Sequence, residues 1–168
     1  MSLTETDLAH LRRTLELASE ALVAGDAPFG SVLVDARGLF LREDRNRTAT
    51  LGDGTRHPEL ELARWAATNM AFEERAAATV YTSGEHCAMC AAAHAWVGLG
   101  RVVFVASVGQ LAGWQREFRD GSDGYESPVA PLPIRVVAPG VPVQGPVPEF
   151  EEQIKDLHRR WAKKRGLV

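Results

Sequence analysis

The only two cysteines of the chain, Cys87 and Cys90, stand three positions apart in the stretch TSGEHCAMCAAAHAW. The alanines around them predict a helix over about 87–98, so both thiols are expected on its first turn. In a reducing compartment this spacing is typical of a metal site or a redox pair, although two small buried residues would give the same pattern. If a metal binds, the fold must bring a second segment with further ligands against this turn.

Length and charge limit the classes of protein to which the chain can belong. Its 168 residues suit one domain with a sizeable core, which we expect to span 1–168. The polar, acidic start MSLTETD differs from a signal peptide, and no apolar run approaches the roughly 18 residues of a membrane span. We therefore expect a cytoplasmic protein without membrane attachment. A net charge of −3 argues against a nucleic-acid partner.

Hydrophobic periodicity and turn residues divide the chain into helices and strands. Apolar residues recur at helical spacing from Leu8 to Leu22, after the expected capping residues Thr4 and Asp7. Strands separated by single helices predict an α/β fold, a three-layer α/β/α sandwich with a mixed five-stranded sheet. The later elements are expected as a hairpin of strands at 31–35 and 39–44, a helix at 58–74, a strand at 78–83, a helix at 87–98, a strand at 101–107, an irregular stretch at 109–128, a strand at 134–138 and a helix at 149–164.

A histidine and a glutamate precede the cysteines by about thirty positions, in the triplet His57-Pro58-Glu59. Taken alone, His57 suits a loop or helix cap, and Glu59 suits the first turn of a helix, where the helix dipole favours an acid. Together with the two thiols, His57 completes a set of one nitrogen and two sulfur ligands. Three protein ligands and one open position are typical of catalytic zinc, so we predict that His57, Cys87 and Cys90 bind Zn²⁺.

Two further histidines lie close enough in the sequence to serve as a fourth ligand. His86 adjoins Cys87, and His94 follows Cys90 by one helical turn. A fourth protein ligand would close the site and make it structural; we favour the open, three-ligand site. Glu59 then lies beside the metal as a free carboxylate, where it can take a proton from water and pass it on.

The triplet His57-Pro58-Glu59 with EHCAMC (85–90) resembles the zinc-dependent cytidine and nucleobase deaminase superfamily, whose pattern is His-x-Glu followed by Pro-Cys-x-x-Cys. APFGSVLVD (27–35) and EDRNR (43–47) resemble segments of its guanine deaminases and tRNA adenosine deaminases, and the order of elements is similar over nearly the whole chain. His86 stands where the family usually has proline, and Pro58 where close relatives usually have alanine. Both positions belong to the pocket wall, so they bear on the substrate.

The resemblance implies roles for further residues. Glu59 would carry protons from water to a ring nitrogen and to the departing amine, which leaves as ammonia. Asn46 would hydrogen-bond the ring edge, unless it is only an Asx-turn residue. The remaining candidates are Phe29 as a stacking ring or a core aromatic, Pro58 as part of the substrate-binding wall, Trp114 as a pocket cover or a loop anchor, and Glu117, or nearby Asp120, as a second proton-carrying acid or a solvated loop acid.

These residues favour an aminohydrolase that acts on a free base, guanine first, or on a related pyrimidine or triazine, and the resemblance implies a homodimer. A tRNA adenosine deaminase shares the motif, and the basic sequence KDLHRRWAKKR would suit it, although such a run is also typical of a solvated helix face. The third alternative is a non-catalytic zinc protein, in which the metal joins two helices and Glu59 is dispensable.

Overall fold

The computed structural model describes residues 2–118 and 127–166, and these residues contain a five-stranded sheet with the strand order β2-β1-β3-β4-β5. β1 pairs antiparallel with β2 and β3, whereas β4 runs parallel to β3 and β5 parallel to β4, so the sheet is mixed, as predicted. Parallel neighbours need crossover connections, which helices provide. The strands are β1 Gly30–Val34, β2 Phe40–Arg45, β3 Thr79–Gly84, β4 Arg101–Ala106 and β5 Val143–Gln144.

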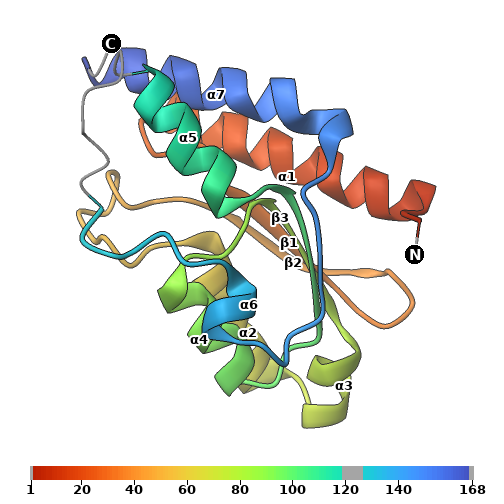
Figure 1. Cartoon of the computed structure of the whole chain (residues 1–168). Coiled ribbons are helices and arrows are strands. Elements are labelled where there is room, and N and C mark those ends of the chain that lie inside the picture. The colour runs from red at the N-terminus through yellow and green to blue at the C-terminus, as the bar shows by residue number, and fades with distance from the viewer. Residues whose placement is uncertain (1, 119–126, 167–168) are drawn as a thin grey trace.

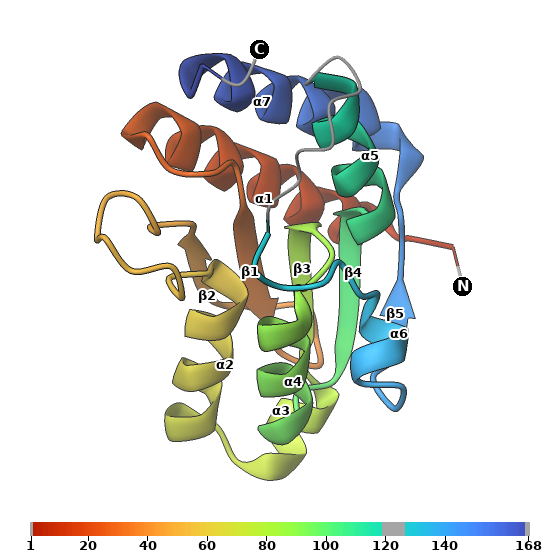
Figure 2. The same ribbon diagram turned by 60° about the vertical axis from the view of Figure 1, so that its left-hand side comes forward.

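Helices cover both faces of the sheet and give the three predicted layers (Figure 1). α1, α5 and α7 lie together on one face, while α2 and α4 lie side by side on the other, with α6 next to α4 (Figure 2). The helices are α1 Glu5–Ala24, α2 Pro58–Asn69, α3 Phe72–Ala77, α4 Ala88–Trp96, α5 Val108–Phe118, α6 Ile134–Val137 and α7 Glu151–Lys164, with a 3₁₀ turn at Pro148–Phe150 before α7.

The inner strands are buried on both faces because their side chains alternate between apolar clusters on the two sides of the sheet. Val32 and Val103 face the core shared with α1, α5 and α7, whereas Leu33 and Val80 face the core shared with α2. All four side chains are at most 1% exposed. Burial on both faces is typical of α/β sheets, and it leaves the ends of the strands as the place for a ligand site.

The first helix begins and ends as its sequence predicts. The Thr4 hydroxyl accepts a hydrogen bond from the Asp7 backbone N–H, and the Asp7 carboxylate accepts one from the Thr4 N–H at 2.7 Å, which together form a capping box. Gly25 ends the helix with φ of 100°, a conformation that glycine adopts without strain. None of the helices in the described part of the chain combines the length and apolar character needed to cross a membrane.

The sequence predicts an irregular stretch at 109–128, but Val108–Phe118 forms the helix α5. Gly109 and Gly113 lower its helix propensity, which is why the pattern reads as a loop. Trp114 and Phe118 nevertheless pack into the core beside α7. Packing of an apolar face therefore outweighs weak propensity here.

The predicted strand at 134–138 is also wrong, because Ile134–Val137 forms the short helix α6 and the fifth strand follows at Val143–Gln144. The backbone N–H of Ile134 donates to Glu85 Oε1 at 2.9 Å, so this amide is held by a carboxylate and not by a neighbouring strand. The predicted helix at 58–74 divides into α2, which ends at Asn69, and α3, which begins at Phe72.

Candidate functional site

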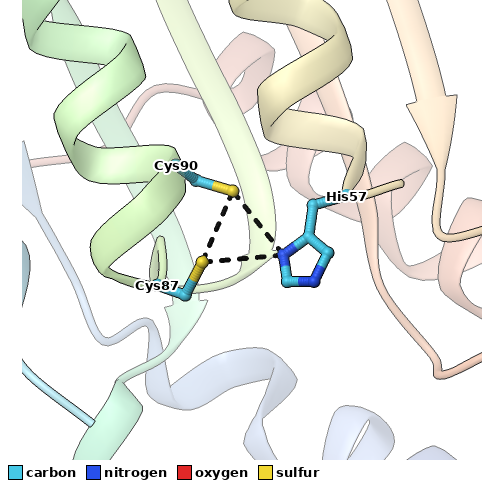
Figure 3. A group of neighbouring side chains, drawn as sticks. All are labelled: His57, Cys87 and Cys90. Carbon is cyan, nitrogen blue, oxygen red and sulfur yellow. Dashed lines mark hydrogen bonds between the residues drawn. The ribbon is translucent and has the colours of Figure 1, made fainter. Parts of the chain in front are cut away.

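The three predicted metal ligands meet where α2 and α4 begin. His57 is the N-cap of α2, Cys87 is the N-cap of α4, and Cys90 lies in the first turn of α4. The Cys87 and Cys90 sulfurs are 3.5 Å apart, and each lies 3.6 Å from Nδ1 of His57 (Figure 3). Two helices packed side by side thus bring ligands about thirty residues apart into one group.

The geometry of this group fits zinc. A tetrahedral ion with Zn–S near 2.3 Å and Zn–N near 2.05 Å holds its ligand atoms roughly 3.5–3.8 Å apart, which is the range seen here. Two thiolates and a neutral imidazole also offset the 2+ charge of the ion. His57 and Cys87 line the adjoining pocket, so a fourth position would face that pocket.

Hydrogen bonds within the group shift the pKa values of the two thiols in opposite directions. The Cys87 and Cys90 sulfurs are hydrogen-bonded to each other, and this bond lowers the pKa of Cys87 to about 4, although burial opposes it. The same bond, together with burial, raises the pKa of Cys90. The bond with Cys87 raises the pKa of His57, again against the effect of burial. Cys87 is therefore a thiolate at neutral pH, the form that binds metal.

Glu59 lies on the first turn of α2, two residues after His57, and is only 6% exposed. Its Oε1 accepts a hydrogen bond from the Thr82 hydroxyl at 2.9 Å, and the Cys90 thiol lies 3.8 Å from its Oε2. Burial raises the pKa of Glu59 above that of an ordinary glutamate. His57, Cys87 and Cys90 are called the metal group below. A carboxyl group with a raised pKa, beside this metal group and a pocket, suits proton transfer.

A pocket of about 410 Å³ opens beside the metal group and lies in the size range of small-molecule sites. Glu85 follows β3 and Val108 follows β4, and both line it, so the pocket lies outside the carboxyl ends of these parallel strands. Its walls come from both helical layers: His57 and Glu59 belong to α2, whereas α5 and α7 provide the opposite side.

The other predicted site residues divide between the pocket and the core. Asn46 and Phe29 line the pocket. Pro58 is buried at the first position of α2 but is absent from the described lining, and Trp114 is 6% exposed and packs into the core, as an anchor would. Glu117 is half exposed and pairs with Lys155 of α7 at 2.8 Å, away from the described lining. Asp120 lies outside the described residues.

Neither candidate for a fourth ligand joins the three-residue group among the described residues. His94 Nε2 lies 2.8 Å from the Gly100 carbonyl and donates to it, so this nitrogen is already paired with the backbone. The His86 ring is 1% exposed and packs edge-on against His94, with the ring centroids 5.2 Å apart. The described geometry therefore favours the open site over the closed one.

Sequence reasoning missed several polar residues that line the pocket, among them Glu85, Gln115 and His158. The Glu85 carboxylate accepts backbone N–H bonds from Val108 at 3.0 Å and from Ile134 at 2.9 Å, so it ties the segment before Cys87 to α5 and α6. Glu85 lies within the motif EHCAMC, so its place beside the cysteines was a usable signal. Gln115 and His158 carry no such signal, because they lie in helices with ordinary polar sequences.

Phe29 is held between Gly84 and His158. A Cβ atom on Gly84 would lie 2.8 Å from Cε1 of Phe29, closer than van der Waals contact allows. On its other side, the Phe29 ring meets the His158 ring edge-on, with the centroids 5.0 Å apart. The strand end β3 and the helix α7 thereby fix the position of this pocket aromatic.

Residues 4–106 match the family model described as the cytidine and deoxycytidylate deaminase zinc-binding region. A probable cytosine deaminase of Schizosaccharomyces pombe is 35% identical over 102 residues, which are 61% of this chain and 61% of the relative. A tRNA-specific adenosine deaminase of Haemophilus influenzae is 36% identical over 104 residues, 62% of this chain and 60% of the relative. The matches thus span about three fifths of the length of these curated relatives.

A solved structure of guanine deaminase from Nitrosomonas europaea has a similar fold. Its TM-score against this chain is 0.65 at 22% identity, and the superposition covers 92% of this chain and 84% of that one. At this identity the similarity shows the shared fold. The three relatives act on different substrates by name, so the substrate of this chain must be argued from its own pocket.

Proposed function

The chain belongs to the cytidine and deoxycytidylate deaminase zinc-binding family, and we propose that it hydrolytically removes the exocyclic amine from a small free base, guanine first, or from a related pyrimidine or triazine. One observation carries this proposal. The His57, Cys87 and Cys90 group and the buried Glu59 carboxyl adjoin a pocket of about 410 Å³, large enough for a base.

The proposed reaction adds water to the ring carbon that bears the amine, breaks the C–N bond and releases ammonia, leaving a carbonyl group. When bound by His57, Cys87 and Cys90, zinc supplies a Lewis acid that makes water a competent nucleophile near neutral pH. Glu59 takes a proton from the attacking water and delivers it to the ring nitrogen. It then takes the remaining proton from the hydroxyl group added to the ring carbon and passes it to the departing amine, so that a carbonyl group and ammonia are formed. Its raised pKa suits a group that must accept and release a proton in turn.

Asn46 is the best-placed residue for holding the ring near Glu59. Its Oδ1 accepts hydrogen bonds from the Thr48 N–H at 3.0 Å and the Thr48 hydroxyl at 2.9 Å, the pattern of an Asx turn. The oxygen is thereby occupied, and the Nδ2 amide hydrogens are left to donate to an acceptor on the ring. Both interpretations of Asn46 therefore apply at once, and Phe29 adds an aromatic surface to the same pocket.

A tRNA substrate is the second candidate, because the tRNA-specific relative is as similar as the cytosine deaminase one. The basic side chains of α7 give it limited support. Lys155 pairs with Glu117, Arg159 and Arg160 lie within 4 Å of Asp156, and the net charge of the chain is −3. Surface pairs of this kind reduce the charge available to phosphates.

The proposal also includes one domain over 1–168, a homodimer and a cytoplasmic location. Trp96 at the end of α4 is 89% exposed, and Phe72 in α3 is 60% exposed. Large exposed apolar side chains are typical of a surface that a partner covers. Sedimentation equilibrium on the wild type and on Trp96→Ser would test the homodimer.

Ammonia release by the zinc-loaded protein tests the proposed function. The panel contains guanine, cytosine, adenine, amino-triazines, the matching nucleosides and a tRNA anticodon hairpin, with Glu59→Ala as the control. We expect release from a free ring and a fall of roughly 10²–10⁴-fold in Glu59→Ala, which should keep its zinc. Release from the hairpin alone would favour the tRNA candidate. Zinc binding with no release from any compound would favour the non-catalytic zinc protein.

A further inference from the structure

The side of the pocket opposite the metal group contains a histidine without a hydrogen-bond partner. His158 of α7 lines the pocket and is 3% exposed. Neither of its ring nitrogens bonds any residue in the described part of the chain, and Nε2 is fully buried. Burial lowers the pKa of His158 to about 3, so the ring is neutral at pH 7 and offers one N–H donor and one nitrogen acceptor.

A second polar side chain on this side of the pocket also has a buried atom without a hydrogen-bond partner among the described residues. Gln115 of α5 lines the pocket, and its Oε1 is buried with no partner among the residues described. The rings of Phe29 and Trp114 hold His158 in place, with centroids at 5.0 and 6.3 Å. A buried polar atom without a partner destabilises the fold, and two on one pocket wall point to a ligand that bonds them.

We propose that His158 is a substrate-binding residue that hydrogen-bonds the ring edge remote from the reacting amine, and that together with Gln115 it selects free bicyclic bases over single-ring bases and nucleosides. This inference rests on the proposed function, which fixes the amine end of the ring beside Glu59 and the metal group. A ring held there extends from the α2 and α4 layer toward the α5 and α7 layer, where His158 and Gln115 lie.

The chemistry of the two groups matches one kind of edge. The five-membered ring of a free purine base presents one nitrogen acceptor and one N–H donor on the side away from the pyrimidine amine. His158 can donate to the acceptor, and the Gln115 oxygen can accept from the N–H. A nucleoside has a sugar in place of that N–H, and a single-ring pyrimidine has no such edge. Both would leave buried polar atoms of the pocket unpaired, which is the basis of strong discrimination.

The test compares guanine with 7-deazaguanine, which keeps the N–H but lacks the nitrogen acceptor that His158 would bond, on the zinc-loaded wild type, His158→Phe and His158→Gln. We expect His158→Phe to lower kcat/KM for guanine by about 10- to 100-fold, mainly through KM. It should change turnover of 7-deazaguanine by less than about 3-fold, because that compound has no acceptor for His158 to bond. His158→Gln, whose amide nitrogen lies near the place of Nε2, should recover part of the loss. His10→Gln is the control, because His10 bonds the Gly38 carbonyl and is absent from the described lining.

Equal losses on both compounds, or no loss on guanine, would overturn the inference. The ratio of the two kcat/KM values does not depend on how much of a variant is folded, so partial misfolding cannot produce the expected result. If neither variant folds, the comparison is made on the wild type alone: equal turnover of guanine and 7-deazaguanine would contradict the hydrogen bond assigned to His158.

The outcomes also separate this inference from the proposed function. Ammonia release from cytosine alone would uphold the proposed function and overturn the role of His158. No release from any ring would refute the proposed function. Calorimetry with xanthine, the product of guanine deamination, would then test whether His158 still recognises the ring. Xanthine binding that is lost in His158→Phe would support the recognition role, whereas equal or absent binding would overturn it.

Discussion

Two walls of one pocket differ in how far their polar groups are already paired. The near wall contains His57, Glu59 and Cys87, with the buried Cys90 in contact with them, and the two thiols, the Glu59 carboxylate and His57 Nδ1 have partners at 2.9–3.8 Å. The far wall consists of Gln115, His158, Trp161 and Arg165 from α5 and α7, and its buried Nε2 and Oε1 atoms have none among the described residues. The near wall is thus organised before substrate arrives, whereas the far wall is completed by it.

The strongest test of the near wall is Cys90→Ser. Cys90 is fully buried, and its sulfur lies within 3.6 Å of the other two ligand atoms. Loss of one of three ligands should weaken zinc binding by more than about 100-fold, the upper end of what outer-shell changes cost, and ammonia release should fall to background. Zinc content by mass spectrometry checks this, with His94→Gln as the control that keeps its metal. Full zinc retention in Cys90→Ser would break the three-ligand assignment.

A smaller effect is expected from Thr82→Val, which keeps the shape of the side chain and removes the hydroxyl that donates to Glu59 Oε1. We expect kcat to fall by about 10-fold with zinc retained. The Thr82 bond lowers the pKa of Glu59, so its loss should raise that pKa further. The base form of Glu59 is needed, and the acid limb of the kcat–pH profile should therefore move to higher pH. Ser31→Ala, which touches Thr82 but not Glu59, is the control, and an unshifted acid limb would contradict the assignment.

Trp161→Ala tests the far wall by the form of its kinetic effect. Trp161 lines the pocket on the same side as His158, and the Arg165 guanidinium stacks on its ring at 5.2 Å. Truncation should raise KM by about 3- to 10-fold and leave kcat and zinc content nearly unchanged, because the far wall binds the substrate without taking part in bond breaking. Steady-state kinetics on the best substrate of the panel measures both. A fall in kcat at constant KM would contradict the assignment of substrate binding to the far wall and of bond breaking to the near wall.

Glu117→Gln should have the smallest effect. Its carboxylate is half exposed and pairs with Lys155 outside the described pocket lining. We expect kcat to change by less than about 2-fold and the free energy of unfolding by less than about 0.5 kcal/mol, as for most exposed ion pairs. Urea titration and the ammonia assay measure these quantities. A 10-fold fall in kcat would restore Glu117 as the second proton-carrying acid.

The near wall could be predicted from the sequence because its chemistry is concentrated in short motifs. The two cysteines are the only ones in the chain, and both they and His57 lie at helix starts that can be recognised from local pattern. The mixed sheet was predictable for a similar reason, since the buried strands β1 and β4 have apolar runs and β3 contains β-branched and aromatic residues.

The far wall could not be predicted, because its position depends on packing between distant segments. His158 resembles any polar residue of an amphipathic helix until α7 packs against α1 and α5. Gln115 lies in α5, whose glycines hide the helix, and β5 is too short for an apolar pattern to develop. Tertiary contacts determine these elements, and local sequence patterns do not predict such contacts.

The contact between Gly84 and Phe29 makes the two positions a single unit for protein engineering. A side chain at position 84 would collide with the Phe29 ring, so a library that varies only position 84 should return few folded variants. Pairing Gly84→Ala with Phe29→Leu removes the collision and reshapes the pocket beside His158 without touching the metal group. Paired substitutions at positions 84 and 29 could therefore change base selectivity in ways that neither single substitution would show.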